Sequence, residues 1–167
     1  MTPTYREKPP EAHTGGFGEP TCLACHLDAP LNEPSGKLVI IGLPDRFEHG
    51  QVYPLTISLT HPSLAIAGFQ LSARFREGGL RGRQAGKFVT DANRLAVSEL
   101  DGIEYVHHTL ESLAATRDTA RWQIRWTAPT TGGDVELNVA ANASNDDASA
   151  LGDRIYTLSV RIPAQKD

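Results

Sequence analysis

The stretch Gly68-Phe-Gln-Leu-Ser-Ala-Arg-Phe-Arg76 decides the fold class of this chain. From Phe69 to Phe75 every second residue is apolar, and the residues between them are Gln, Ser and Arg. Successive side chains of a β-strand point to opposite faces, so this period of two predicts a strand with one buried face and one face in water.

The same period of two recurs along most of the chain after residue 37. The longer runs are 55–59, 122–126, 135–139 and 156–162, and the shorter candidates are 38–41, 88–90, 95–98 and 103–107. Clusters of Gly, Pro, Asn and Asp separate these runs, and the stretch that permits a helix, 110–115, is short. Eight or nine short strands with turn signals between them predict an all-β fold, a β-sandwich with Trp122 and Trp126 in its core.

Length, composition and charge place the chain among single-domain soluble proteins. With 167 residues, 40% hydrophobic and 22% charged, it can fill one core of ordinary composition. The formal net charge of −4 at pH 7 argues against a nucleic-acid binder, which would carry a basic patch. No apolar run approaches the length of a membrane span, and residues 1–16 contain no signal-peptide hydrophobic region.

Both cysteines of the chain lie in one pentapeptide, Cys22-Leu-Ala-Cys-His26. C-x-x-C-H is the attachment signature of a c-type haem. The thiols of Cys22 and Cys25 would add to the two vinyl groups on one edge of the porphyrin, and His26 would lie beneath the ring as the proximal iron ligand. The sequence therefore predicts one covalent haem c held by these three residues, with a single short helical turn around the motif.

Three other interpretations of the cysteine pair remain open. A disulfide between Cys22 and Cys25 would close a very small loop and leave the rest of the fold without a covalent cross-link. A thioredoxin-like dithiol usually follows a strand and opens a helix, whereas residues 14–21 are typical of a loop. A zinc site would need two more ligands from distant histidines.

The haem iron would need a sixth ligand or an open position. The usual partner in class I cytochromes c is Met, but the only Met of this chain is Met1. The sixth position of the iron would therefore be taken by a second His or by a Lys, or it would stay open. The other histidines are His13, His49, His61, His107 and His108. Adjacent strand residues point to opposite faces, so one of His107 and His108 would face the sandwich and the other solvent, and one of them is predicted as the distal ligand.

The sequence divides into three segments. Residues 1–20 are polar and Pro-rich and are predicted to form an extended arm, 21–36 carry the haem attachment motif, and 37–167 form the sandwich. Haem attachment to C-x-x-C-H takes place outside the bacterial cytoplasm. We therefore expect a periplasmic or extracellular protein, with its leader removed or replaced by the initiator Met. Membrane association is expected only through a partner or a lost anchor.

Six segments, taken in order, are similar to the bacterial reelin-domain proteins, also called Reeler-like or choice-of-anchor proteins. These segments are 14–26 (TGGFGEPTCLACH), 68–71 (GFQL), 105–109 (YVHHT), 122–129 (WQIRWTAP), 140–142 (AAN) and 152–157 (GDRIYT). The resemblance spans about residues 14 to 162. It implies an exported, immunoglobulin-like (Reeler-type) β-sandwich with a haem motif at its N-terminal edge.

The family's Y-x-x-H-T segment matches Tyr105 to Thr109, which places the family histidine at His108. The resemblance therefore implies His26 and His108 as the two iron ligands, with His107 as the neighbouring alternative. The chain departs from the family at Gly16-Phe17, where Ala-Pro is usual, so the loop near the haem is expected to differ in shape.

A covalently held haem with two axial histidines favours electron transfer without enzyme activity. The expected partner is a redox protein or a larger electron-transfer complex, and no nucleic acid. A different class of function is an extracellular adhesion or assembly module in which the haem is structural. If His108 does not bind the iron, an open position would bind small gases or peroxide, and the protein would be a sensor or an enzyme.

Overall fold

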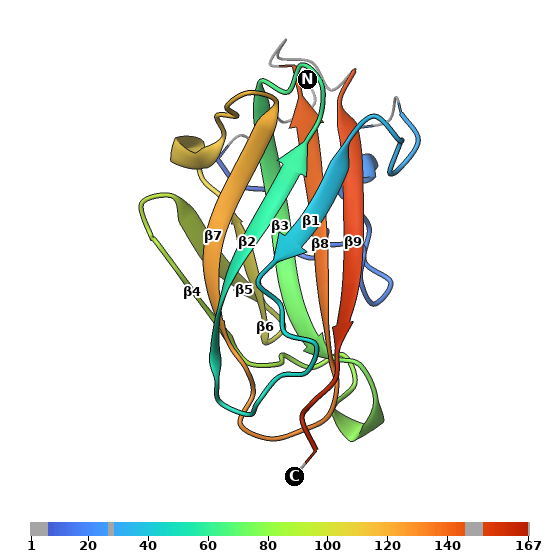
Figure 1. The fold of residues 1–167 in the computed structure, drawn as a ribbon. Helices are drawn as coiled ribbons and strands as arrows, with labels where there is room; N and C mark the ends of the chain where they lie inside the picture. Colours follow the sequence, from blue (N-terminus) through green and yellow to red (C-terminus); the bar gives the residue numbers. More distant parts are fainter. Residues whose placement is uncertain (1–6, 27–28, 146–151, 167) are drawn as a thin grey trace.

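The computed structural model describes residues 7–26, 29–145 and 152–166, which form a β-sandwich of two antiparallel sheets (Figure 1). These described residues contain the strands β1 (Lys37–Ile41), β2 (Val52–Thr60), β3 (Ile66–Phe75), β4 (Lys87–Thr90), β5 (Leu95–Leu100), β6 (Ile103–His108), β7 (Thr119–Thr127), β8 (Val135–Ser144) and β9 (Arg154–Ile162). One sheet has the order β1-β2-β7-β4, and the other has the order β5-β6-β3-β8-β9. Short 3-10 helices lie outside the sheets: η1 (Cys22–Ala24), η2 (Gly78–Leu80) and η3 (Leu110–Ser112).

Every run that the period of two marks as a strand lies within or largely within one of these strands, so the prediction of an all-β sandwich is confirmed. Several strands are longer than predicted. β8 continues to Ser144, past the predicted end at 139. Ala140 and Ala141 are both buried, so the alternation that marks a half-wet strand stops there although the strand continues. The stretch that permits a helix forms only the single turn of η3.

Aromatic side chains on β7 fill the space between the two sheets. Trp122 and Trp126 are both buried, which confirms them as core residues. The Trp122 ring packs against Phe69 of β3 with 4.5 Å between ring centroids, and the Trp126 ring packs against Tyr53 of β2 at 5.9 Å. Each indole N–H donates to a backbone carbonyl oxygen, at 3.0 and 3.1 Å, so the two rings are buried without an unsatisfied hydrogen-bond donor.

The outer face of the five-stranded sheet is covered rather than wet. Gln70, Ser72 and Arg74 alternate with the core residues of β3, yet all three are buried. The expectation that the polar half of β3 faces water is therefore wrong. Residues 7–20, the described part of the predicted arm, pass behind this sheet in Figure 1 and exclude water from it.

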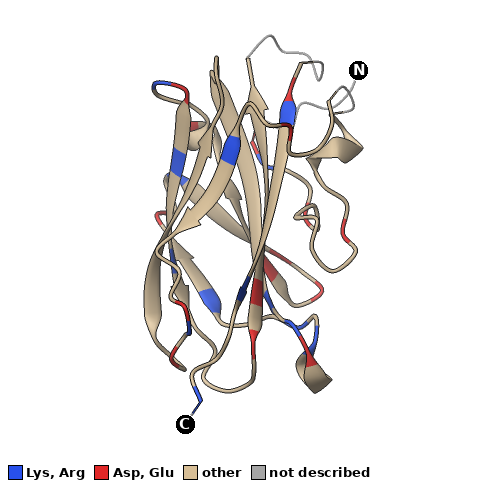
Figure 2. Ribbon diagram, turned by 45° about the vertical axis from the view of Figure 1, so that its right-hand side comes forward, with Lys and Arg blue, Asp and Glu red and all other residues tan. Residues whose placement is uncertain are grey.

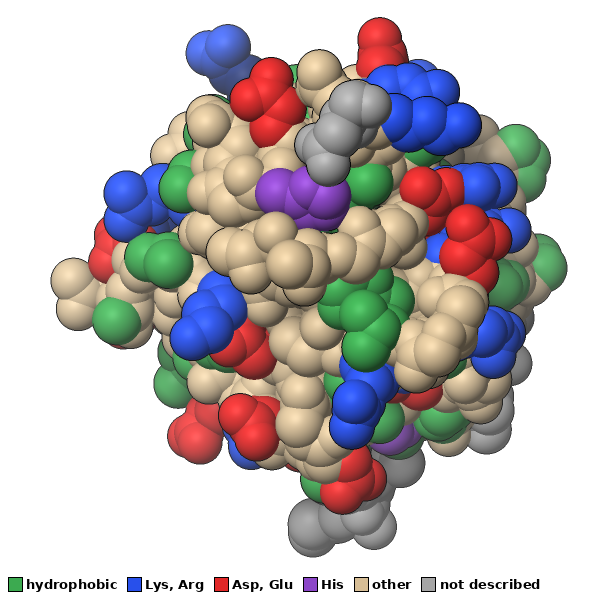
Figure 3. Space-filling model, turned by 90° about the horizontal axis from the view of Figure 1, so that it is seen from below, with side chains coloured by type: hydrophobic (Ala, Val, Ile, Leu, Met, Phe, Trp, Pro, Cys, Tyr) green, Lys and Arg blue, Asp and Glu red, His purple; other side chains and the backbone are tan. Residues whose placement is uncertain are grey.

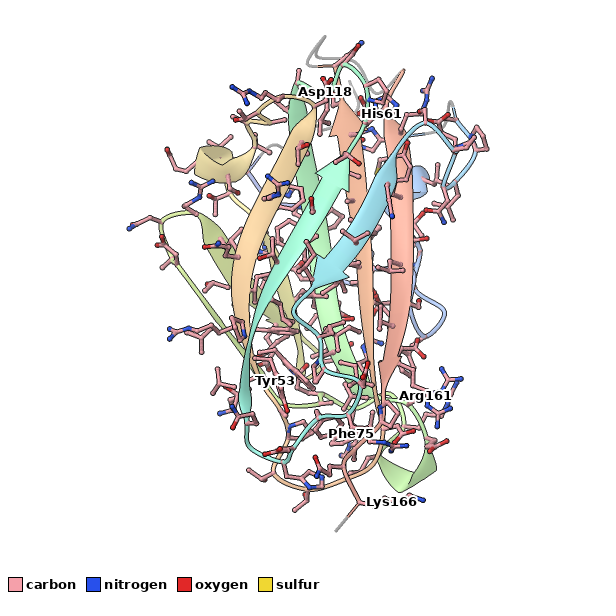
Figure 4. All side chains as sticks on the ribbon, in the orientation of Figure 1. Tyr53, His61, Phe75, Asp118, Arg161 and Lys166 are labelled. Carbon is pink, nitrogen blue, oxygen red and sulfur yellow. The ribbon has the colours of Figure 1, made fainter. Side chains whose placement is uncertain are left out.

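The two ends of the sandwich can be followed in Figure 4. His61 and Asp118 lie at its upper end, whereas Phe75, Arg161 and Lys166 lie at its lower end, where the C-terminus is. The His61 amide donates to the Asp118 carbonyl oxygen at 3.1 Å, which joins the end of β2 to the start of β7. β3 begins and β8 ends at this upper end.

Charged side chains are spread over the surface with both signs mixed. Figure 2 shows Lys and Arg positions interspersed with Asp and Glu positions along the strands and loops. The lower end, seen in Figure 3, carries both signs around small separate apolar patches. In the part of the chain that the structure describes, no helix is long and apolar enough to cross a bilayer.

Truncation of a residue between the sheets should be costly. Leu137 of β8 is 0% exposed and Leu110 is 52% exposed, so the same substitution at the two positions compares a buried leucine with an exposed one. We expect Leu137→Ala to lower the free energy of unfolding by about 2–5 kcal/mol, and Leu110→Ala to change it by less than about 0.5 kcal/mol. Urea unfolding followed by tryptophan fluorescence measures both, and equal losses would show that β8 does not pack into the core.

Candidate functional site

The C-x-x-C-H motif forms one tight turn, as the sequence predicts. The amides of Cys25 and His26 both donate to the Cys22 carbonyl oxygen at 3.1 Å, which closes η1. The hydroxyl oxygen of Thr21 accepts a hydrogen bond from the Leu23 backbone amide at 3.1 Å and caps the turn. Both thiols and the imidazole are thereby held on one short piece of backbone.

The two thiols are free, and both residues are partly exposed. Burial is the largest cause that raises the pKa of the Cys22 thiol, to about 12, against a backbone hydrogen bond that lowers it, and the neighbouring Cys25 adds to the rise. A reactive dithiol of the thioredoxin type needs the opposite, a pKa lowered to about 7 or below. The environment of Cys22 therefore disfavours the dithiol alternative.

His26 lies against two polar side chains from the other end of the chain. Its Nδ1 is 2.8 Å from Oδ2 of Asp153, which directly precedes β9, and its Nε2 is 3.5 Å from Nδ2 of Asn142 on β8. Asn142 also donates to the same Asp153 oxygen at 3.0 Å. The angle at Nδ1 is poor for a hydrogen bond, so the contact with Asp153 is chiefly electrostatic.

Asp153 is a buried carboxylate, with a side chain that is 2% exposed. Burial alone would raise the pKa of this carboxyl, but its interactions with His26, Asn142 and Ser144 outweigh it and lower the pKa below its ordinary value. Asp153 is therefore ionised at neutral pH and places a full negative charge beside His26.

Sequence reasoning assigned no role to Asn142 or Asp153. Both lie in segments that the family resemblance marks, 140–142 and 152–157, and a carboxylate is a usual second partner of a metal-binding imidazole. Their contacts with His26 join positions 116 residues apart for Asn142 and further apart for Asp153, so only the fold brings them together.

His108 ends β6 with a buried imidazole that packs against Gly68. A Cβ on Gly68 would lie 2.6 Å from Cε1 of His108, so the ring occupies space that a side chain would need. Nδ1 of His108 accepts a hydrogen bond from the Phe69 amide at 3.0 Å and lies 3.4 Å from the Phe69 carbonyl oxygen. The missing side chain at Gly68 is what lets this imidazole rest on β3.

The structure brings His26 and His108 to the same face of the same sheet. Gly68 of β3 pairs with Asn142 of β8, and the side chains of paired residues point to the same face. His108 packs against Gly68 and His26 contacts Asn142, so the two imidazoles flank this one pair of residues. The pair lies toward the upper end of the sandwich, where β3 begins and β8 ends.

His107 is buried as well, so the expectation that one of the adjacent histidines faces solvent is wrong. Its strand partner is Gln70, which accepts from the His13 amide and donates to the Pro10 carbonyl, both at 2.8 Å. The arm thus covers this face of β6 too. Burial lowers the pKa of His107, and its Nδ1 lies 2.8 Å from the His108 carbonyl oxygen.

Each of the three remaining histidines of the sequence contacts a different oxygen group outside the C-x-x-C-H turn. These contacts are His13 with the Glu11 carbonyl at 2.8 Å, His49 with the Gly132 carbonyl at 3.0 Å and His61 with the Glu33 carboxylate at 3.4 Å. The assignment of His108 as distal ligand stays a prediction.

The residues at this site fit a covalent haem. Such a haem needs two thiols on one turn and an imidazole whose Nδ1 is held by a second group, which Cys22, Cys25, His26 and Asp153 supply. Gly68 adds a place for a second imidazole on the same face. Within residues 7–26, 29–145 and 152–166, no group of three or more His, Cys, Asp or Glu side chains is arranged to hold a metal ion by itself.

A buried ion pair fixes the segment that carries the motif. Arg74 of β3 forms a salt bridge with Glu19, just before the motif, and the two side chains are 8% and 9% exposed. Tyr105 of β6 donates its hydroxyl proton to Glu19 at 2.6 Å and accepts from Arg74 at 2.7 Å. The ring of Phe17 lies 5.2 Å from the Arg74 guanidinium. We call Glu19, Arg74 and Tyr105 the arm clamp, because they lock the arm to two strands.

Fold and site together define a small β-sandwich with a C-x-x-C-H turn packed on the outer face of one sheet. The reeler domain of human F-spondin (fragment 1) is similar, with a TM-score of 0.57 and 26% sequence identity over 81% of this chain and 94% of that one. The Reelin-N domain of F-spondin has a TM-score of 0.57 and 23% identity over 86% of this chain and 97% of that one. No protein-family model and no curated protein matches the chain. The chain therefore has a reelin-like β-sandwich fold, as the sequence resemblance implies.

Loss of the Glu19 charge should leave Arg74 buried without its ionic partner. We expect Glu19→Gln to lower the free energy of unfolding by about 3–5 kcal/mol, because an uncompensated buried charge is costly. Glu136→Gln is the matched control, since its partner Arg76 is 44% exposed and a surface pair contributes only about 0–1 kcal/mol. Urea unfolding of both variants measures the difference. A loss in Glu19→Gln no larger than in the control would refute the arm clamp.

Proposed function

We propose that this protein is a c-type cytochrome with a single covalent haem and that it transfers electrons outside the cytoplasm. The observation that supports this most is the turn of Cys22, Cys25 and His26, with Nδ1 of His26 against the Asp153 carboxylate. Two neighbouring thiols and an imidazole supported in this way match the attachment and proximal-ligand set of haem c.

Each residue of the site has a separate role in this proposal. Cys22 and Cys25 would hold the haem through thioether bonds, formed when each S–H adds across a vinyl group, and His26 would bind the iron. His108 would be the second imidazole ligand. The haem, when bound, supplies one-electron oxidation and reduction. Because two imidazoles replace the Met ligand that raises the potential in cytochromes c, we expect a lower potential than theirs.

His108 must change its hydrogen bond before it can bind iron. While Nδ1 accepts from the Phe69 amide, the proton of the neutral ring resides on Nε2, and a protonated nitrogen has no lone pair to offer. The Phe69 carbonyl oxygen lies 3.4 Å from the same Nδ1, so a turn of the ring would exchange the amide for the carbonyl. Nδ1 would then carry the proton, and Nε2 would have the lone pair that iron requires.

The same hydrogen bond favours a second candidate function. If His108 keeps the Phe69 amide as its partner, the sixth position of the iron stays open. An open iron binds small gases or peroxide, and the protein would then be a haem sensor or enzyme rather than an electron carrier.

An adhesion or assembly module with a structural haem is the alternative from a different class. It draws on the similarity to the F-spondin reeler domain, which is a similarity of fold. One fold hosts many unrelated functions, so the residues at the C-x-x-C-H turn carry more weight than the fold does.

The electron-transfer proposal includes a partner and a location. The partner is a redox protein or a larger redox complex, reached through a small and transient interface. The location is periplasmic or extracellular, and any membrane association is indirect, through that partner or a separate anchor.

Removal of both thiols should abolish covalent haem. Expressed in a host competent for c-type maturation, the parent should retain haem after acid–acetone extraction, and the double variant Cys22→Ala, Cys25→Ala should retain none. Ala24→Ser, inside the same turn, is the control and should keep its haem. A parent without covalent haem would overturn the proposed function and bring back the zinc and disulfide interpretations.

Removal of the imidazole at position 108 should open the iron. We expect a low-spin parent whose reduced spectrum is unmoved by carbon monoxide, and a high-spin His108→Ala that binds carbon monoxide. His107→Ala is the matched control, because it removes a buried imidazole one residue away, and it should stay low-spin. A low-spin His108→Ala would exclude this residue as ligand, and a parent that binds carbon monoxide would favour the open-iron candidate.

A further inference from the structure

We infer that Asp153 controls the haem iron from the far side of His26: it fixes which imidazole nitrogen faces the iron, and its charge lowers the reduction potential. The inference rests on the proposed function, because it takes His26 as the proximal ligand.

The contacts of His26 define one arrangement of its ring proton. Nδ1 faces the Asp153 carboxylate at 2.8 Å, and Nε2 faces the amide nitrogen of Asn142 at 3.5 Å. An amide N–H only donates, so the contact with Asn142 puts the lone pair on Nε2 and the proton of the neutral ring on Nδ1, where the negative charge of Asp153 favours it. Nε2 is the nitrogen that the iron would bind, and Asp153 therefore selects the competent tautomer before any haem is present.

The carboxylate also holds together three parts of the chain. It contacts His26 in the attachment segment and Asn142 on β8, and it directly precedes β9. The contact with Asp153 on one side of the His26 imidazole limits the rotation of that ring. Asp153 is thus a positioning residue, which acts on the iron through the imidazole.

Among the residues that the structure describes, no Lys or Arg side chain forms an ion pair with the Asp153 carboxylate. The Asp153 side chain is almost completely buried, so water screens it weakly. The adjacent cation Arg154 donates to the backbone carbonyls of Gly152 and Asp153, at 2.9 and 3.2 Å, and is 3.9 Å from the Glu33 carboxylate. These contacts direct Arg154 to groups other than the Asp153 carboxylate.

A negative charge behind the proximal ligand favours the oxidised iron. Ferric haem carries one more positive charge than ferrous haem, so an ionised carboxylate stabilises the ferric state more. The carboxylate also makes the imidazole a stronger donor to the metal, which acts in the same direction. Asp153 therefore lowers the potential in addition to the effect of replacing Met by a second His.

Asp153→Asn removes the charge with little change in shape. In the haem-loaded protein we expect the equilibrium constant for reduction to rise at least tenfold, which is 59 mV for a one-electron couple. Asp134→Asn is the matched control: Asp134 is also held by hydrogen bonds that lower its pKa, but its partner Arg161 lies at the lower end of the sandwich. The potential of the control should stay at the parent value.

The outcomes separate this inference from the proposed function. An unchanged potential in Asp153→Asn, with haem attached, would overturn the inference and leave the cytochrome proposal standing. A parent without covalent haem would overturn the cytochrome proposal itself.

A second measurement uses the full haem-free parent chain and does not depend on the variant folding. The ¹⁵N chemical shifts of His26 should show the ring proton on Nδ1. A proton on Nε2 would overturn the positioning role of Asp153.

Discussion

The salt bridge between Arg74 and Glu19 is the contact on which the rest of the site depends. Arg74 lies on the outer face of β3, and a guanidinium can stay buried there only with a partner of opposite charge. Glu19 supplies that charge, Tyr105 bridges the two, and Glu19 lies three residues before Cys22, where the C-x-x-C-H motif begins. The same salt bridge therefore helps to bury the polar face of the sheet and to place the C-x-x-C-H turn.

Coverage by the arm turns the five-stranded sheet into the middle layer of the molecule. Gln70 holds the arm at two points, and Gly16 lies so close to the sheet that a Cβ there would be 2.1 Å from the Asn138 side chain. The glycines of the loop before the motif thus permit a close approach of backbone to sheet. The surface that presents His26 is built jointly by the arm, by β8 and by the residue that precedes β9.

The sequence predicts the strands well because a period of two is a local signal that each segment carries by itself. It predicts Cys22, Cys25 and His26 for the same reason, since the motif is contiguous. The failures are non-local. The wet face of β3 and the solvent-facing histidine were both expected from alternation alone, and both are buried because a segment 50 or more residues away covers them. Asp153 and Asn142 join the site only through the register of β8 and β9.

The position of the motif in the chain sets an order of events in the making of this protein. Synthesis runs from the N-terminus, and the C-x-x-C-H turn emerges well before β8, β9 and Asp153 exist to contact His26. The attachment segment therefore leaves the ribosome without the residues that hold its imidazole in the folded sandwich. Those contacts form only when the last two strands have been made, so the turn gains its final surroundings at the end of folding.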